Sequence, residues 1–184
     1  MSVRIVDLAS DPAFVDGAAA LLHDAFRGRS SDWQDLDSAR AEVCESLEER
    51  RVSRVAIDGG VIGWIGAIPL YGGKVWEVHP LVVASSHRRR GVGRSLIEDI
   101  EKTAAERGAL TLFTGSDDEN DETSLSSADL YRDVATAIRD VRNFKQHPYE
   151  FYLRVGFKLV GVLPDANGIG KPDIFLAKRV ARRR

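Results

Sequence analysis

Two side chains that can transfer protons, Glu77 and His79, lie two positions apart within residues 75–83. This stretch is rich in valine and aromatic residues, a composition typical of a β-strand. Because alternate side chains of a strand point to the same face, a regular strand would place the carboxylate and the imidazole side by side. Either group can serve as a general base, the imidazole by nature and a carboxylate once it is buried. The plainer interpretation of each is a polar residue on the wall of a cleft.

A second candidate site follows that strand directly. Residues 87–95 read His-Arg-Arg-Arg-Gly-Val-Gly-Arg-Ser and lead into an amphipathic helix that begins near Val92. Glycine lets a ligand approach the backbone closely, and a helix start offers unpaired N–H groups and the positive end of the helix dipole. The order of strand, arginine- and glycine-rich turn and helix predicts an anion site suited to a pyrophosphate. A tight turn with solvated arginines is the alternative.

Two other phosphate-binding loops are excluded by the residues present. A Walker loop requires Gly-x-x-x-x-Gly-Lys-Ser/Thr, whereas Gly93 is followed by Arg94, and a dinucleotide fingerprint requires a third glycine where Leu96 stands. What remains is Arg88-x-x-Gly91-x-Gly93 in its context over 75–107. This stretch closely resembles the Arg/Gln-x-x-Gly-x-Gly/Ala signature of the GNAT superfamily of acetyl-CoA-dependent N-acetyltransferases.

The run from His147 to Phe157 carries a second resemblance. It is similar to the short helix of the same superfamily that ends in Tyr-x-x-x-Gly-Phe, here Tyr152 to Phe157, with Gly156 as the stop signal. The family often has an asparagine seven residues before that tyrosine, where this chain has Lys145. A narrower resemblance, to aminoglycoside 6′-N-acetyltransferases, rests on the Gly-Ser-Asp-Asp run that begins at residue 115 and on its acidic surroundings.

The resemblance implies an enzyme in which a primary amine attacks acetyl-CoA directly. Glu77, either alone or through a water molecule, would be the general base, because several family members carry a catalytic glutamate at this distance from the arginine motif. His79 is the alternative base. Tyr152 would be the general acid that protonates the departing thiolate. No covalent enzyme intermediate is implied, and Cys44 lies far from either motif.

The resemblance also assigns the residues that would bind acetyl-CoA, the cosubstrate. The pantetheine arm would lie along the strand end at Leu81, Val82 and Val83, and the N–H of Leu81 would hold the developing oxyanion. Pro80 predicts a local bulge that frees these backbone groups. The backbone that would hold the pyrophosphate comprises Arg88, Arg89, Arg90, Gly91, Val92, Gly93 and Arg94.

Composition bounds the remaining possibilities. The chain has 184 residues, enough for one domain with a sizeable core, and a net charge of −2, which gives no support to nucleic-acid binding. The single cysteine excludes an internal disulfide and suits a reducing cytoplasm. The first residues lack the apolar block of a signal peptide, and no apolar run is long enough to cross a membrane. The four histidines are not spaced as metal ligands, so we expect no metal.

Hydrophobic periodicity predicts alternating strands and helices, and the resemblance implies an α/β (α+β), GNAT-like fold with a mixed, mostly antiparallel sheet of about seven strands flanked by helices. Residues 1–184 would form a single N-acetyltransferase domain with an acidic loop-plus-helix insertion at about 115–146. The expected strands are 3–8, 52–57, 61–70, 75–83, 110–114, 157–163 and 174–180. The expected helices are 13–27, 36–50, the helix after Gly91, 128–142 and the short helix before Gly156.

The acceptor is the least defined part of this interpretation. Trp33 and Asp35 lie in the loop before the second helix, which walls the acceptor site in this family, and Asp117 and Asp118 begin a run of carboxylates that would attract a cation. We therefore expect a small cationic amine, aminoglycoside-like or polyamine-like, although an exposed loop and a solvated acidic run are the plainer interpretations. A protein or peptide N-acetyltransferase and a non-catalytic acetyl-CoA sensor are the alternatives. Because family members often dimerise, a homodimer is a further expectation.

Overall fold

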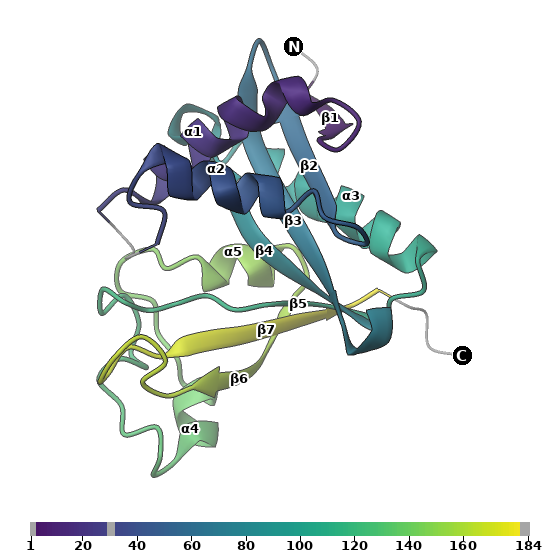
Figure 1. Cartoon of the computed structure of the whole chain (residues 1–184). Helices are drawn as coiled ribbons and strands as arrows, with labels where there is room; N and C mark the ends of the chain where they lie inside the picture. The colour runs from purple at the N-terminus through teal and green to yellow at the C-terminus, as the bar shows by residue number, and fades with distance from the viewer. Residues whose placement is uncertain (1–2, 29–31, 181–184) are drawn as a thin grey trace. The chain divides into compact units, whose positions relative to one another are not determined.

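The computed structural model describes residues 3–28 and 32–180 and divides into two compact units. The first unit comprises Met1–Leu112 with Val180–Arg184, and the second comprises Phe113–Arg179. Within the described ranges the sheet has seven strands, mostly antiparallel, and five α-helices accompany it (Figure 1). The fold class expected from the sequence is thereby confirmed, whereas the single-domain organisation stays a prediction.

Most element boundaries match the periodicity of the sequence. The strands are β1 (Arg4–Asp7), β2 (Val52–Ile57), β3 (Val61–Leu70), β4 (Val75–Val83), β5 (Thr111–Thr114), β6 (Lys158–Leu163) and β7 (Asp173–Arg179). The α-helices are α1 (Val15–Phe26), α2 (Leu36–Glu45), α3 (Val92–Glu106), α4 (Val134–Arg139) and α5 (Tyr149–Arg154). The described residues also form short 3₁₀ turns: η1 (Pro12–Phe14), η2 (Tyr71–Gly73) and η3 (Ser85–His87).

The first unit is an antiparallel meander with helices on both faces. β1 pairs with β2, β2 with β3 and β3 with β4, each antiparallel. α1 and α2 lie in front of these strands in the view of Figure 1, and α3 lies behind them. On the α3 face Gly63 of β3 leaves room for the side chains of Val92 and Leu96, since a Cβ on Gly63 would lie 3.0 Å from each.

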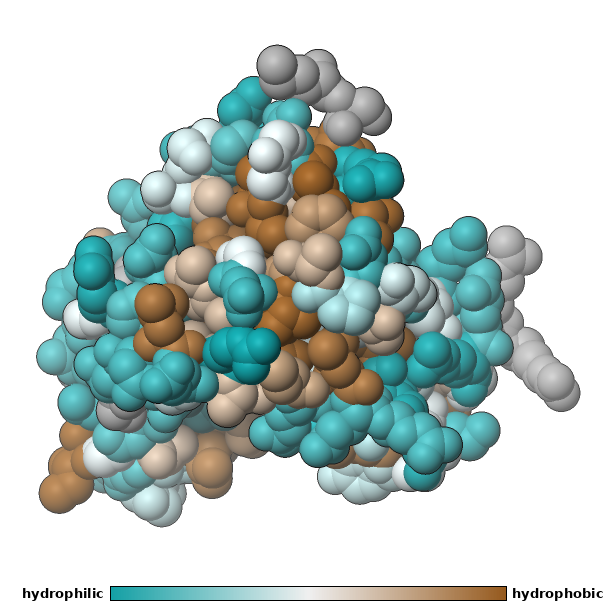
Figure 2. All heavy atoms as spheres, turned by 45° about the horizontal axis from the view of Figure 1, so that its top comes forward, coloured by the Kyte–Doolittle hydropathy of each residue, from teal (hydrophilic) through white to brown (hydrophobic). Residues whose placement is uncertain are grey.

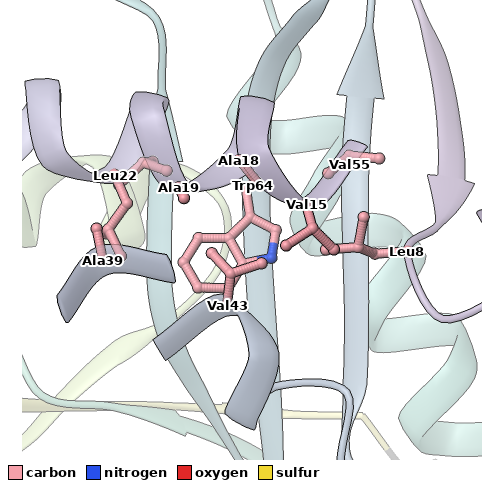
Figure 3. Close-up of a cluster of buried hydrophobic side chains, with 10 residues drawn as sticks. Leu8, Val15, Ala18, Ala19, Leu22, Ala39, Val43, Val55 and Trp64 are labelled. Atoms are coloured by element: carbon pink, nitrogen blue, oxygen red, sulfur yellow. The ribbon is translucent and has the colours of Figure 1, made fainter. Parts of the chain in front are cut away.

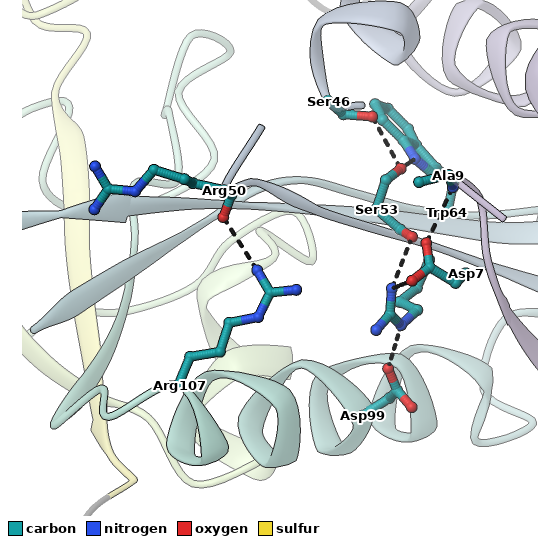
Figure 4. Close-up of polar contacts among 9 residues, drawn as sticks. Asp7, Ala9, Ser46, Arg50, Ser53, Trp64, Asp99 and Arg107 are labelled. Atoms are coloured by element: carbon teal, nitrogen blue, oxygen red, sulfur yellow. Dashed lines mark hydrogen bonds and ion pairs between the residues drawn. The ribbon is translucent and has the colours of Figure 1, made fainter. Parts of the chain in front are cut away.

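The core under α1 and α2 is built around Trp64 of β3. Its indole is fully buried among Val15 and Leu22 of α1 and Val43 of α2 (Figure 3). Indole N–H donates to Ser53 Oγ at 2.9 Å, and Ser46 Oγ donates to the same oxygen at 2.9 Å (Figure 4). The one polar atom of the largest core side chain is thus satisfied, which a buried tryptophan requires.

An ion-paired arginine ties β1, β2 and α3 together. Arg54 of β2 contacts Asp7 Oδ2 at 2.8 Å through Nη1 and Asp99 Oδ2 of α3 at 2.9 Å through Nε (Figure 4). Because Arg54 is largely buried and has two carboxylate partners, its charge is balanced within the unit. The helix that begins at the arginine-rich turn is therefore fixed to the sheet by charge as well as by its apolar side.

The second unit contains β6 and β7, which pair antiparallel, and the short helix α5. The end of α5 forms a Schellman motif: Phe157 N–H donates to the Tyr152 carbonyl at 3.0 Å and Gly156 N–H to the Leu153 carbonyl at 3.1 Å. Gly156 adopts φ 99°, the left-handed conformation that this motif needs. The helix stop expected at Gly156 is confirmed.

The helix expected over 128–142 is wrong in extent, because α4 covers only Val134–Arg139. Asp133 accepts a hydrogen bond from Thr136 N–H at 3.0 Å and so caps the helix at that point. Residues 128–132 instead form turns, with Arg132 N–H donating to the Asp129 carbonyl at 3.2 Å. Aspartate side chains favour such caps and turns over helix interiors, and they override the apolar spacing here. Tyr131, one of the apolar residues of this stretch, is 78% exposed.

No helix in the described ranges 3–28 and 32–180 is long and apolar enough to cross a membrane. The face shown in Figure 2 is mostly hydrophilic, with hydrophobic residues gathered in its middle.

Candidate active site

A β-bulge interrupts the pairing of β3 with β4 at the candidate site. Ala67 pairs with Val78 and Ile65 with Leu81, so that Gly66 lies opposite two residues, His79 and Pro80. A Cβ on Gly66 would collide with the carbonyl oxygen of His79. The peptide bond between His79 and Pro80 is cis. The bulge predicted from Pro80 is therefore present, and Gly66 is the residue that accommodates it.

The bulge decides which side chains of β4 share a face. The ring of His79 lies 5.9 Å from that of Trp33, in the loop before α2, whereas Trp76 lies under Arg107 at the end of α3. His79 therefore faces the side of α1 and α2, and Trp76 faces α3. Val82, three positions after His79, also belongs to the core cluster under α1 and α2. In a regular strand these two residues would point to opposite faces, so the bulge brings them to the same one.

Glu77 lies on the same face as His79, two residues before it in the regular part of the strand. Its side chain is partly buried. The carboxylate makes no hydrogen bond or ion pair with any residue in the ranges that the structure describes. A half-buried carboxylate that has no partner among these residues is available to a ligand, as a general base must be.

His79 has a carboxylate neighbour that sequence reasoning missed. Glu42 Oε1 of α2 lies 3.9 Å from His79 Nε2, and Glu42 Oε2 accepts a hydrogen bond from the Trp33 indole at 3.4 Å. The Glu42 side chain is 19% exposed and that of His79 47% exposed. Glu42 thus links Trp33 and His79, two residues that were expected at the site from different parts of the sequence.

Trp33 and Asp35, the two residues of the loop before α2 that are expected to contact the acceptor substrate, are held in different ways. Trp33 adopts φ 54° and packs edge-on against Phe26 of α1, with 4.7 Å between ring centroids. Its carbonyl oxygen also lies 3.1 Å from His23 Nδ1. Asp35 is the N-cap of α2: its side chain accepts from Ser38 N–H at 2.7 Å, and this bond lowers the pKa of Asp35. The Trp33 ring is therefore anchored beside the face of β4 that carries Glu77 and His79. Asp35 caps α2, and its contact with the acceptor stays a prediction.

The arginine-rich turn has the geometry of an anion cradle. After η3 the chain is extended at Arg88 and left-handed at Arg89, φ 61°, and Gly91 adopts φ 89° as the N-cap of α3. Gly91 has no side chain, so the N-cap residue of α3 makes no side-chain hydrogen bond to the first N–H groups of the helix. The first turn of α3 contains no acidic residue, and Arg88, Arg89 and Arg90 are exposed around it. These features fit a pyrophosphate.

The strand end that leads to the cradle is also held in place. Arg88 Nε donates to the Val83 carbonyl at 3.2 Å, so that Arg88 folds back over the end of β4. Leu81 and Val83 remain paired with Ile65 and Gly63 of β3. Leu81 and Val83 are half-buried, whereas Val82 is buried under α1 and α2. β4 thus runs without interruption from the bulge to the turn.

Tyr152, the expected general acid, lies in α5 of the second unit. Its ring is buried and packs edge-on against Phe151 and Phe157, with centroid distances of 5.2 and 5.4 Å. Burial raises the pKa of Tyr152, and a hydrogen bond with Thr114 opposes the shift without reversing it. The phenol is therefore held in its protonated form, which is the form that a general acid needs.

The two aspartates expected to contact the acceptor lie in different surroundings. Asp118 is fully buried, and its carboxylate accepts hydrogen bonds from Glu122 N–H at 2.7 Å, Thr123 N–H at 2.8 Å and Thr123 Oγ1 at 2.8 Å. It organises its own loop, which differs from the expected role of a substrate contact. Asp117 is exposed and accepts a hydrogen bond from Asn167. Only Asp117 presents its carboxylate at the surface.

The acidic loop is fixed to the start of α5 by a buried histidine. His147 Nε2 lies 3.0 Å from the Asp117 carbonyl, and His147 Nδ1 accepts from Tyr149 N–H at 3.2 Å. Asn143 holds the same residue by two hydrogen bonds to its backbone, at 2.8 and 3.0 Å.

Within the described part of the chain no group of His, Cys, Asp and Glu side chains could hold a metal ion.

The fold and the cradle fit an acyltransferase whose cosubstrate carries a pyrophosphate, and comparisons with known proteins define the family. The family model described as "Acetyltransferase (GNAT) family" matches residues 18–132. A search of curated proteins gives no significant match.

Solved structures extend the likeness to the whole chain. An aminoglycoside 6′-N-acetyltransferase complexed with coenzyme A is 39% identical, with a TM-score of 0.90, over 100% of this chain and 99% of that chain. The aminoglycoside 6′-N-acetyltransferase from Enterococcus faecium is also 39% identical, with a TM-score of 0.87 and the same coverage. An aminoglycoside 6′-acetyltransferase type Ii is 35% identical, with a TM-score of 0.75, over 100% of both chains.

The chain belongs to the GNAT acetyltransferase family. It is an acetyl-CoA-dependent N-acetyltransferase, as its arginine-glycine motif predicts. Membership of an enzyme family at this level of identity sets aside the non-catalytic sensor. The individual roles of the site residues stay proposals.

Proposed function

We propose that this enzyme transfers the acetyl group of acetyl-CoA to a primary amine of a small cationic acceptor, with an aminoglycoside as the leading candidate. The observation that carries the proposal is Glu77, a half-buried carboxylate that has no partner among the described residues. It lies on the face of β4 that also carries His79, whose ring is 5.9 Å from that of Trp33. Structural relatives at 35–39% identity that are named aminoglycoside 6′-N-acetyltransferases support the choice of acceptor. A polyamine is the second small-molecule candidate.

The residues of the cradle would hold the cosubstrate. Backbone N–H groups between Arg88 and Arg94 would bind the pyrophosphate at the start of α3, and the end of β4 from Leu81 to Val83 would line the pantetheine arm. Bound acetyl-CoA supplies an acetyl thioester that an amine can attack. The N–H of Leu81 would stabilise negative charge on the thioester oxygen, a contribution of about 3–4 kcal/mol in comparable sites.

Glu77 and Tyr152 would carry the two proton transfers. An ammonium ion has no lone pair, so the acceptor must lose a proton before it attacks, and Glu77 is the proposed base, directly or through water. His79 is the alternative. Tyr152, protonated because burial raises its pKa, would protonate the departing thiolate. Direct attack requires no covalent enzyme intermediate, and Cys44 lies exposed on α2.

The test is CoA release from acetyl-CoA across a panel of aminoglycosides, spermidine, amino acids and a lysine peptide. Turnover with aminoglycosides or polyamines should fall by about 10²–10⁴ in Glu77→Gln and in Tyr152→Phe if the two residues act as base and acid. Glu98→Gln, an exposed carboxylate on α3, is the matched control and should retain activity. Turnover with the lysine peptide alone would favour a protein N-acetyltransferase, the alternative function. Full activity in Glu77→Gln would remove Glu77 as the base.

Two expectations accompany the proposal. A homodimer would show in the sedimentation velocity of the purified chain, and a monomer at micromolar concentration would contradict it. Cytoplasmic localisation is expected from the single cysteine and would be checked by fractionating cells that express the chain.

A further inference from the structure

We propose that Glu42 is a positioning residue for the acceptor side of the site: it fixes the tautomer and orientation of His79, so that His79 Nδ1 accepts a hydrogen bond from the acceptor's ammonium group. The identity of the acceptor in this inference rests on the proposed function, whereas the tautomer of His79 does not depend on it. The sequence gives no indication of it, because Glu42 lies within a helix and carries no motif.

The first step is the position of the Glu42 carboxylate. Its two oxygens face two different partners: Oε2 accepts from the Trp33 indole at 3.4 Å and Oε1 lies 3.9 Å from His79 Nε2. With 19% of the side chain exposed, the carboxylate is largely withdrawn from water. In such surroundings its charge acts on its neighbours more strongly than it would at the surface.

The second step is the consequence for the imidazole. A carboxylate beside Nε2 favours the tautomer in which Nε2 carries the proton and Nδ1 carries the lone pair. Nδ1 makes no hydrogen bond with any residue in the described ranges. Because 47% of the His79 side chain is exposed, a ligand can reach the ring. The imidazole is then a hydrogen-bond acceptor on the face of Glu77.

The third step is the chemistry of the ligand. The acidic groups that face His79 are Glu42 from α2 and Glu77 from its own strand, and Trp33 supplies an aromatic wall. No lysine or arginine forms an ion pair with either carboxylate in the described part of the chain. An ammonium group offers three donors, which match a carboxylate and a neutral imidazole nitrogen. Glu42 thus orients His79 toward the same amine that Glu77 would deprotonate.

The tautomer can be measured without any acceptor, by long-range ¹H–¹⁵N correlation spectra of ¹⁵N-histidine-labelled protein at an alkaline pH. The His79 signals would be assigned with His79→Asn. We expect the Nε2–H tautomer in the wild type and a mixture of tautomers in Glu42→Gln, which keeps the shape but removes the charge. Glu45→Gln, on the same helix and ion-paired with Arg51, is the matched control and should leave the spectrum unchanged. An Nδ1–H tautomer in the wild type, or an unchanged spectrum in Glu42→Gln, would overturn the proposal.

Kinetics supply the second measurement. Glu42→Gln should lower kcat/KM for the acceptor by roughly ten- to a hundredfold, as for carboxylates that orient other functional histidines, and leave the KM for acetyl-CoA within about twofold. A merely structural role would weaken both substrates together, and that result would contradict positioning. If no amine on the panel were acetylated, the proposed acceptor would fail while the tautomer experiment still decided the role of Glu42.

Discussion

Gly66 of β3 lies so close to His79 of β4 that a Cβ at this glycine would collide with the His79 carbonyl oxygen. The contact exists because Gly66 alone faces two residues of the bulged strand. Glycine at this point is therefore a condition for the bulge, and the bulge places His79 and Val82 on the same face of the strand. A residue that touches no ligand thus determines which side chains the candidate site contains.

Gly66→Ala should destabilise the protein and reduce its activity. The added methyl group must displace backbone rather than a flexible side chain, which costs about 1–3 kcal/mol for an overpacked position. Urea unfolding would measure the stability, and CoA release would measure the activity. Gly60→Ala, in the β2–β3 hairpin, is the control because no atom lies within 4 Å of the added Cβ. Equal stability of the two variants would show that the bulge tolerates a side chain.

Local sequence patterns were sufficient for most of the elements. The strands at 52–57, 61–70 and 75–83 have the predicted boundaries, because glycine-containing turns separate these three runs rich in β-branched residues. Pro80 predicted the bulge, and an isolated glycine within a strand, Gly66, was an available signal for its partner. The helix over 128–142 was wrong because capping aspartates override apolar spacing.

The contacts of the candidate site could be predicted less well. Asp117 and Asp118 are adjacent and chemically identical, yet one is exposed and the other fully buried, since only the folded loop decides which carboxylate meets its N–H groups. Glu42 reaches His79 across the packing of α2 on the sheet, and no periodicity within α2 encodes that contact. A sequence motif predicts the local backbone conformation, whereas these contacts depend on tertiary packing.

Gly91→Ala should weaken acetyl-CoA binding. Gly91 adopts φ 89° at the start of α3, and a left-handed non-glycine residue costs about 1–2 kcal/mol, so the turn would relax away from the cradle geometry. We expect the KM for acetyl-CoA to rise by roughly tenfold, the size of one weakened hydrogen bond. Gly108→Ala is a close control, because Gly108 adopts φ 85° just after α3 ends and its Cβ would also meet nothing within 4 Å. Both variants should lose similar stability; a similar rise in KM in both would argue against a specific cradle.

Asp118→Ala should destabilise the acidic loop. The substitution leaves two backbone N–H groups and the Thr123 hydroxyl without their buried acceptor, a loss of about 2–4 kcal/mol for hydrogen bonds to a charged group. Thermal unfolding would show the change. Asp117→Ala removes the neighbouring exposed carboxylate and should change stability little. If Asp117 contacts the acceptor, Asp117→Ala should raise the KM for the acceptor. An unchanged KM would show that Asp117 serves only its hydrogen bond with Asn167.

Tyr152 should make the stability of the protein fall at alkaline pH. Burial raises the pKa of Tyr152 in the folded state above its usual value of 10.0, while the unfolded chain keeps the usual value. Above about pH 10 the unfolded state therefore releases a proton that the folded state retains, and the free energy of unfolding decreases as the pH rises. Tyr152→Phe has no such proton, so its stability should decline less between pH 9 and about 11, as urea unfolding would show. Tyr71→Phe, at an exposed tyrosine, is the control, and an identical alkaline decline in wild type and Tyr152→Phe would contradict a buried, protonated phenol.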